Sequence, residues 1–127
     1  MDQFDLWNIK KKKLNLRANP PFYHERDIWW CSLGKNIGAE QDGEGVEYSR
    51  PVVIIKGLSK NTCLIAPLTS SANHHSLRIP IGVVQDKDSS VIVSQMKVID
   101  TKRLLTKIFR LSQEKFEPIR KAARELL

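Results

Sequence analysis

The sequence of 127 residues contains few cysteines and no long apolar run. Its only two cysteines, Cys31 and Cys63, lie in apolar stretches, which excludes a zinc site built from two cysteine pairs and predicts buried free thiols. No apolar run reaches the ~18 residues that a membrane-spanning helix requires. Residues 1–5 are acidic and lack the apolar core of a signal peptide, so the expected location is cytoplasmic.

Acidic residues are also scarce relative to basic ones. The chain has 21 Lys and Arg against 14 Asp and Glu, which gives a net charge of +7. This excess favours a polyanionic partner, either a nucleic acid or an anionic surface. A nucleic-acid-binding domain without catalytic activity would show the same excess, so charge alone leaves the function open.

Short apolar segments separated by turn residues predict a small, mainly β protein. The expected strands cover residues 27–33, 51–55, 62–68, 77–81 and 90–94, with Pro80 at a strand edge or at a bulge. Their number and length favour one strongly bent antiparallel sheet or barrel, with helices over one end or edge. The predicted fold class is therefore α+β and dominated by strands.

Residues 1–21 are expected to form an N-terminal amphipathic helical extension, and residues 22–127 the barrel domain. In the extension, Phe4, Trp7 and Leu14 recur at helical spacing beside the basic run Lys10–Lys13. That run fits either a contact with RNA or a solvated helix face.

The C-terminal residues predict a second helix, with Ser112 as its N-cap. Pro118 requires this helix either to kink or to begin near Glu117. Upstream, Asp100 is expected to cap a short turn that runs through Leu104 and Leu105. The residues of the helix that share one apolar stripe are Phe116, Ile119, Ala123 and Leu126.

Four polar clusters interrupt the apolar pattern near the ends of the expected strands. They are Glu40 and Gln41 in the glycine-containing loop 34–49, Arg50 before a strand, Thr69, Ser70 and Ser71 after a strand, and Gln95 with Lys97 after another. Each cluster alone is typical of turn chemistry. Together they supply a cation, hydroxyls, an amide and a carboxylate, which suits a phosphodiester site. In the pair Trp29–Trp30, one ring is expected to pack in the core, and a tryptophan here could also stack on a base.

Residues 24–126 resemble the MazF/PemK family of toxins. The matching motifs are, in order, Asp27-Ile28-Trp29-Trp30, Gly38-Ala39-Glu40-Gln41, Ser49-Arg50-Pro51-Val52-Val53-Ile54, Ala66-Pro67-Leu68-Thr69-Ser70 and Ser94-Gln95-Met96-Lys97-Val98-Ile99-Asp100, followed by Lys102-Arg103-Leu104. A single motif of this length is weak, whereas several in the family's order make the resemblance specific.

The resemblance implies an SH3-like β-barrel with a C-terminal helix, paired as a homodimer whose groove binds single-stranded RNA. It also implies a cognate antitoxin protein that occupies the same groove, with operator DNA as a further partner through the antitoxin complex. No cofactor or metal ion belongs to the implied site.

Carried over position by position, the resemblance implies that Arg50 and Thr69 are catalytic and that Glu40 is the loop carboxylate of the site. The residues expected to bind RNA are Gln41, Ser70, Ser71, Gln95 and Lys97. Ser94 and Ala39 stand where some relatives have an acid and a histidine. A mechanism that depends on those two side chains therefore does not apply to this chain unchanged.

The expected function is sequence-specific, metal-independent cleavage of single-stranded RNA by a toxin endoribonuclease. The ribose 2′-oxygen attacks the adjacent phosphate and leaves a 2′,3′-cyclic phosphate and a 5′-hydroxyl end. Arg50 suits stabilisation of the charged phosphorane because its planar fork binds two phosphate oxygens, and Glu40 is the candidate general base. The alternatives are a non-enzymatic gyrase-binding toxin resembling CcdB proteins and a plain nucleic-acid-binding barrel.

Overall fold

The computed structural model describes residues 21–34, 49–71 and 77–127. The expected helical extension up to residue 20, and Glu40 and Gln41 in the loop, lie outside the described residues. Within the described part, the elements in chain order are β1 (Asp27–Ser32), β2 (Ser49–Gly57), β3 (Thr62–Thr69), β4 (Arg78–Val84), β5 (Lys87–Ile92), η1 (Val93–Gln95), β6 (Lys97–Asp100), η2 (Thr101–Arg103), β7 (Leu104–Arg110) and α2 (Gln113–Leu126).

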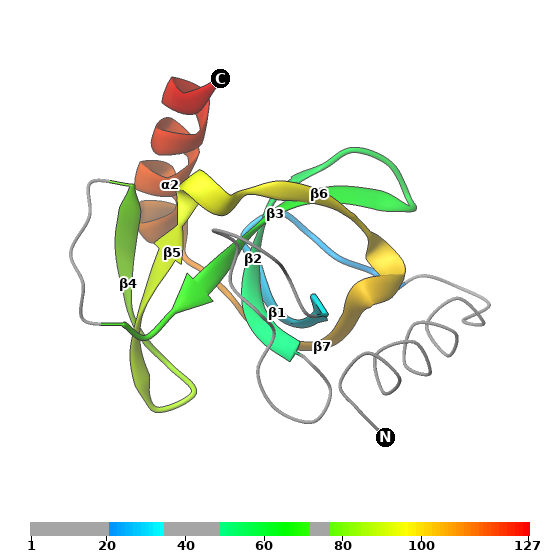
Figure 1. Ribbon diagram of the computed structural model, residues 1–127, viewed down its shortest axis with the longest axis horizontal. Coiled ribbons are helices and arrows are strands. Elements are labelled where there is room, and N and C mark those ends of the chain that lie inside the picture. The colour runs from blue at the N-terminus through cyan, green and yellow to red at the C-terminus, as the bar shows by residue number, and fades with distance from the viewer. Residues whose placement is uncertain (1–20, 35–48, 72–76) are drawn as a thin grey trace.

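The strands form one curled antiparallel sheet in the order β4-β5-β3-β2-β1-β7, and β6 pairs with β3 outside this path (Figure 1). The five expected strands and the antiparallel α+β fold are confirmed. Two strands, β6 and β7, were not predicted. The turn expected through Leu104 and Leu105 is wrong in extent, because η2 ends at Arg103 and Leu104 begins β7. Asp100 does cap this turn, since its carboxylate accepts a hydrogen bond from the Lys102 N–H at 2.8 Å.

Strand β3 bends the sheet because its two halves pair with different partners. Residues Thr62–Ile65 pair with β6, whereas Leu68 and Thr69 pair with β5. The first half therefore belongs to a barrel with β1, β2, β6 and β7, and the second half leads into the β4–β5 hairpin, which stands apart from that barrel in Figure 1. The end of β3 marks the junction between the two parts.

The middle strands are apolar on both faces because two cores lie on either side of them. Val52 and Ile54 of β2 pack inside the barrel with Trp29, Cys31 and Leu104. Alternate residues of β2 face the opposite way and join a second core beneath α2; its members include Val53, Ile55, Leu68, Val91, Phe116 and Ile119. Burial on both sides explains the continuous run of β-branched residues in β2, which carries no alternation.

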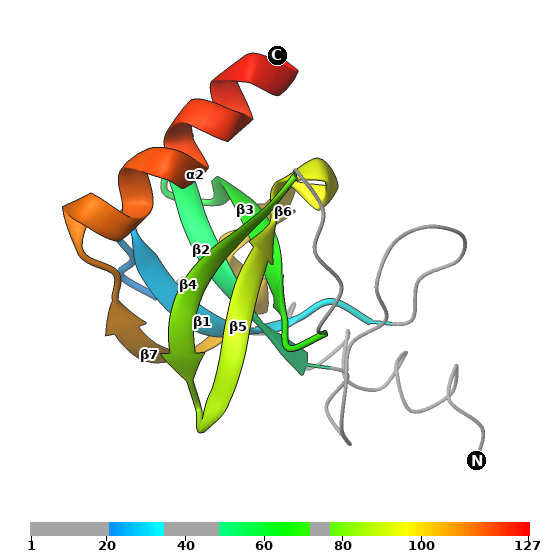
Figure 2. The same cartoon turned by 90° about the vertical axis from the view of Figure 1, so that its left-hand side faces the viewer.

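Helix α2 covers one end of the sheet and packs near β4 and η1 (Figure 2). It begins at Gln113, so the alternative of a start near Glu117 is wrong and Pro118 lies inside the helix. Ser112 caps it as expected, because its Oγ accepts a hydrogen bond from the Lys115 N–H. Within the expected stripe, Phe116, Ile119 and Ala123 are buried, whereas Leu126 is exposed.

The β4–β5 hairpin is bulged at Pro80 and is held against α2. The register shifts between Pro80 and Gly82, as expected for a proline in an outer strand. Gly82 has a φ of +90°, and the Lys115 ammonium donates a hydrogen bond to the Ile81 carbonyl at 3.0 Å. A side chain at Gly82 would press on that ammonium, at 3.1 Å from its nitrogen, and would be strained by the backbone angle as well.

Candidate active site

Arg50 and Thr69 come together because β2 and β3 are neighbouring antiparallel strands. Val52 pairs with Pro67 and Ile54 with Ile65. If this register is extended by two residues, from Val52 back to Arg50, it sets Arg50 opposite Thr69 at the junction of barrel and hairpin. Both side chains are buried, at 6% and 7% exposure, although both are polar.

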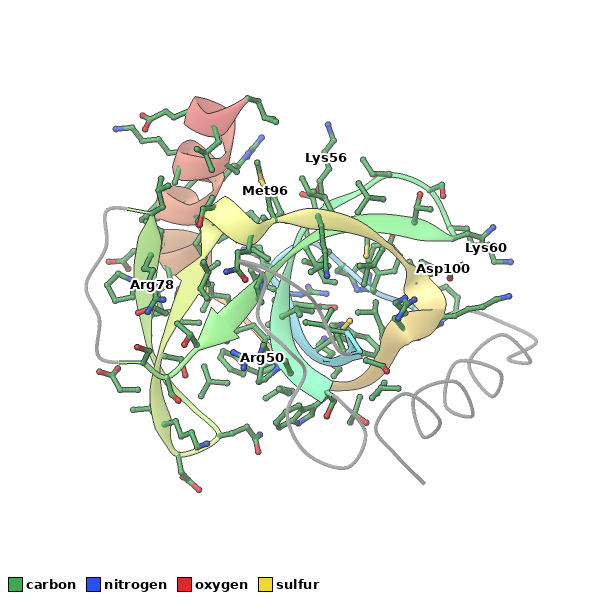
Figure 3. All side chains as sticks on the ribbon, in the orientation of Figure 1. Arg50, Lys56, Lys60, Arg78, Met96 and Asp100 are labelled. Carbon is green, nitrogen blue, oxygen red and sulfur yellow. The ribbon has the colours of Figure 1, made fainter. Side chains whose placement is uncertain are left out.

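A pocket of about 260 Å³ opens at this junction. Predicted site residues on one part of its wall are Arg50, Thr69 and Ser70, and Trp30 of β1 adds an aromatic ring. The β4–β5 hairpin also contributes to the lining, through residues that include Gln85 and Lys87. Figure 3, drawn in the orientation of Figure 1, places Arg50 on the side of the barrel that faces this hairpin.

Hydrogen bonds to the backbone hold the two buried polar side chains at the pocket. The Nη1 of Arg50 donates to the Leu68 carbonyl at 3.0 Å. The Thr69 Oγ1 accepts from the Ser71 N–H at 3.1 Å. A hydroxyl can accept and donate at the same time, so Thr69 can offer its O–H to an oxygen in the pocket. The pair combines a cation with a hydroxyl donor on one wall, which suits a phosphate group.

The two tryptophans of β1 divide as alternation predicts. Trp29 is buried in the barrel core, at 6% exposure. Trp30 is half-buried, pairs with Pro51 of β2 and lines the pocket. An aromatic ring at this position can stack on a nucleic-acid base.

The other expected RNA-binding residues do not all reach this pocket. Ser70 lines it, whereas Ser71 is not among its lining residues and donates its backbone N–H to Thr69. Lys97 lines a separate pocket of about 350 Å³ with Leu33 and Arg103. Gln95 ends η1 and is not among the residues that line the Arg50 pocket.

The hairpin residues Gln85 and Lys87 were missed by the reasoning from sequence. That reasoning ended one strand at residue 81 and began the next at residue 90, so it left both residues in a connecting segment. In the structure, β4 continues to Val84 and β5 starts at Lys87, so the two strands are longer than expected and Gln85 lies in the turn between them. Only the curl of the sheet brings this hairpin beside Arg50.

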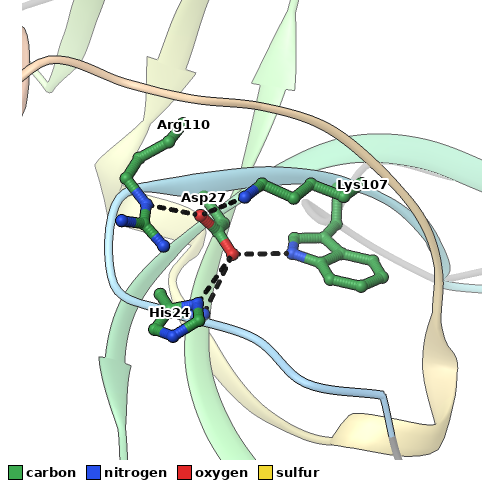
Figure 4. Close-up of polar contacts among 5 residues, drawn as sticks. His24, Asp27, Lys107 and Arg110 are labelled. Atoms are coloured by element: carbon green, nitrogen blue, oxygen red, sulfur yellow. Dashed lines mark hydrogen bonds and ion pairs between the residues drawn. The ribbon is translucent and has the colours of Figure 1, made fainter.

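Asp27, the first residue of β1, carries the other buried charge among the described residues (Figure 4). Its carboxylate accepts hydrogen bonds from the Arg110 Nε at 3.0 Å and the His24 N–H at 2.9 Å, and the Lys107 ammonium lies at 3.4 Å. Burial acts to raise the pKa of Asp27, but these donors, with the Trp29 indole, outweigh burial and lower it. The cluster ties the start of β1 to the end of β7.

The two cysteines are free and buried, as expected. Burial raises the pKa of both thiols to about 12. Because the thiolate is the reactive form, burial disfavours a nucleophilic role for either cysteine near neutral pH. In the part of the chain that the structure describes, no three His, Cys, Asp or Glu side chains gather as a metal-binding group. No helix of that same part is long and apolar enough to cross a membrane.

Fold and pocket together define a class of protein: a small curled β-barrel in which a buried arginine and a buried threonine line one pocket. Comparison with known proteins agrees with this class. The family model described as "PemK-like, MazF-like toxin of type II toxin-antitoxin system" matches residues 24–127. The chain is also 31% identical over 98 residues to the endoribonuclease MazF of Staphylococcus epidermidis, covering 70% of this chain and 78% of that protein.

Solved structures show the same fold. The crystal structure of MazF from Deinococcus radiodurans (Form-I) matches with a TM-score of 0.68 at 15% identity, covering 86% of this chain and 97% of that one. The Mycobacterium tuberculosis toxin MazF-mt6 matches with a TM-score of 0.62 at 18% identity, covering 79% and 94%. The chain belongs to the PemK-like, MazF-like toxin family of type II toxin–antitoxin systems.

Proposed function

We propose that this toxin is a sequence-specific endoribonuclease that cleaves single-stranded RNA without a metal ion. One observation carries the proposal: Arg50 and Thr69 are buried polar side chains that line the same pocket. A guanidinium at the edge of a pocket can donate charge-assisted hydrogen bonds to an anionic group of a ligand. Membership of a family that includes an endoribonuclease from Staphylococcus epidermidis supports RNA as that ligand.

The proposed reaction uses a nucleophile that the RNA carries. The ribose 2′-oxygen loses its proton and forms a bond to the adjacent phosphorus, and the bond from phosphorus to the 5′-oxygen breaks. The leaving 5′-oxygen gains a proton, so the products are a 2′,3′-cyclic phosphate and a 5′-hydroxyl. The enzyme must stabilise the additional negative charge on the phosphorane and move two protons.

Arg50 is proposed to stabilise the phosphorane. Its bond to the Leu68 carbonyl fixes the orientation of the guanidinium, and the planar fork can donate to two phosphate oxygens at once. Thr69 is proposed to donate its hydroxyl to one of these oxygens. Glu40 is proposed as the general base on the family resemblance, and Gln41, Ser70, Ser71, Gln95 and Lys97 as residues that bind RNA.

An antitoxin protein is the proposed macromolecular partner. The relative from Deinococcus radiodurans has been solved as a MazE–MazF complex, which matches this chain with a TM-score of 0.62. A mycobacterial endoribonuclease has likewise been solved with its cognate antitoxin. We extend the proposal to a homodimer, for which light scattering on the purified protein is the direct measurement, and to operator DNA as a ligand of the toxin–antitoxin complex.

The deciding experiment incubates the purified toxin with a long single-stranded RNA in EDTA and maps both ends of every product. We expect discrete cuts with 5′-hydroxyl and cyclic phosphate ends. Arg50→Ala should lower the cleavage rate about 10²–10³-fold, the typical cost of losing a positioned donor to a developing oxyanion. Arg120→Ala is the matched control, because Arg120 is exposed on α2, forms an ion pair with Glu117 at 3.7 Å and is not among the residues that line the Arg50 pocket.

Two results would overturn the proposal. Full cleavage by Arg50→Ala would remove Arg50 from the site. Absence of cuts by the wild-type toxin would favour a protein that acts by binding. In that case, binding of gyrase points to the CcdB-like alternative, and salt-sensitive binding of RNA or DNA points to a plain nucleic-acid-binding barrel.

A further inference from the structure

The turn between β4 and β5 has an unusual conformation for its residues. Val84 pairs with Lys87, so Gln85 and Asp86 form a two-residue hairpin loop. Both have positive φ angles, 52° and 63°. Positive φ at both central residues is the mark of a type I′ turn, for which Asn-Gly, Asp-Gly and Gly-Gly are the preferred sequences. Glutamine is not a residue that this backbone selects.

Residues held in sparsely populated backbone regions concentrate at functional sites, where the surrounding structure maintains the strained conformation. Gln85 has such a site beside it, because it lines the Arg50 pocket, whereas Asp86 does not. Gln85 is itself exposed, so packing in the core does not account for its presence. Two residues in the same turn therefore share the backbone conformation and differ in access to the pocket.

The hairpin fixes where these side chains stand. Val84, next to the turn, is buried in the core beneath α2. On the other arm, the Ser89 hydroxyl donates to the Lys87 carbonyl at 2.9 Å. Ser89 also lines the pocket and is buried. Gln85 and Lys87 are thus exposed side chains on an anchored frame, which is what precise contact with a ligand requires.

We propose that Gln85 is a specificity-determining residue that reads the edge of an RNA base lying between Trp30 and the hairpin. A glutamine amide offers a donor and an acceptor together, which matches the edge of a base, and Trp30 offers a face for stacking. Lys87 holds a flanking phosphate as a point charge. This inference rests on the proposed function and adds the residue that selects the cleavage sequence.

The test compares Gln85→Gly with Asp86→Gly on a library of randomised single-stranded RNA. Both changes relieve a positive φ, so both should maintain or raise the free energy of unfolding. Only Gln85→Gly should lower kcat/KM at the preferred site, by about 10-fold, and relax the sequence preference at one position, because one base contact is lost. Asp86→Gly should retain the wild-type preference.

Lys87→Gln separates charge from base reading. It should weaken cleavage of all sequences uniformly and reduce the slope of log affinity against log salt by about 1, without changing the preferred sequence. Lys121→Gln, at an exposed position of α2, is the control and should change neither. An altered sequence preference in Lys87→Gln would overturn the assignment of Lys87 to a phosphate.

An unchanged cleavage preference in Gln85→Gly would overturn the inference. Equal changes in cleavage preference in Gln85→Gly and Asp86→Gly would also overturn it, because the effect would then come from the backbone of the turn and not from the Gln85 side chain. If the wild type makes no cuts, the proposed nuclease activity is wrong, but the role of Gln85 can still be tested. The test then compares the binding of 2′-deoxy oligonucleotides of different sequence to the wild type and to Gln85→Gly. A base preference lost in Gln85→Gly supports the inference, and identical binding overturns it.

Discussion

Asp27 and Arg50 are both buried charged residues near the start of neighbouring strands, and they differ in their access to a pocket. Asp27 is fully enclosed and is contacted by cations and N–H donors from β7, from Trp29 and from the segment before β1. Arg50 borders a pocket. An enclosed charge surrounded by opposite charge holds elements together, whereas a buried charge at a pocket can receive a ligand. Burial alone therefore does not identify the site; access does.

Substitution at Arg50 should give the largest effect, and the effect should be on activity. Arg50→Lys retains the positive charge but loses the planar fork. We expect kcat/KM for RNA to fall about 10²-fold, while the free energy of unfolding changes by less than about 1 kcal/mol. Single-turnover cleavage and urea denaturation measure the two quantities. A loss of stability without a loss of activity would place Arg50 in the same structural role as Asp27.

Substitution at Asp27 should give the reverse pattern. Asp27→Asn removes the charge that Arg110 and Lys107 contact, so we expect the free energy of unfolding to fall by about 2–3 kcal/mol. Asp27 does not line the Arg50 pocket, so activity measured well below the melting temperature should stay within about 3-fold of the wild type. A 3-fold change in rate corresponds to less than about 1 kcal/mol. Urea denaturation and RNA cleavage are the measurements. Asp88→Asn, at an exposed position of β5, is the control.

The stabilising effect of Asp27 should depend on pH in a defined direction. Its pKa is lower in the folded protein than the ordinary value of 3.8, so the unfolded chain takes up a proton first as the pH falls. The full contribution is present above about pH 5 and is lost as the pH falls below about 4. The stability difference between wild type and Asp27→Asn should therefore shrink from pH 5 to pH 3. A difference that stays constant would show that the charge of Asp27 does not stabilise the fold.

The smallest expected effect concerns the helix that follows the Asp27 cluster. Ser112→Ala removes the N-cap of α2 and should lower the free energy of unfolding by about 1 kcal/mol, less than Asp27→Asn. Thermal denaturation measures the difference, and Ser112→Asn should restore most of it because asparagine also caps helices. A larger effect for Ser112→Ala than for Asp27→Asn would reverse the ranking of these two neighbouring structural features.

The local chemistry of the chain could be predicted from the sequence. The apolar runs predicted strands β1 to β5, Ser112 was the predicted N-cap of α2, and Pro80 predicted a strand edge or a bulge. Strand β7 could not be found in this way, because Leu104–Arg110 alternates weakly and carries Thr106, Lys107 and Arg110 among its apolar residues. Its pairing with β1 across the barrel, together with the ion pairs to Asp27, makes it a strand.

The site was predictable only in part. The resemblance to the toxin family directed attention to Arg50 and Thr69, and the register of β2 and β3 brings these two residues to one pocket. No local pattern indicated Gln85 and Lys87, because their relevance depends on how the hairpin folds back beside β2. Lys97 shows the converse: its sequence position suited the site, yet β6 pairs with the far half of β3 and sets it at another pocket.

The sequence by itself determined the residue types and their local order: β-branched runs that form strands, caps and prolines that bound the elements, and an arginine and a threonine at strand ends. These depend on interactions between near neighbours, which the sequence displays directly. The tertiary structure alone decided which of two buried charges is enclosed and which borders a pocket. That choice arises from the bend of β3, where one strand pairs with two partners, and long-range pairing of this kind leaves no local trace in the chain.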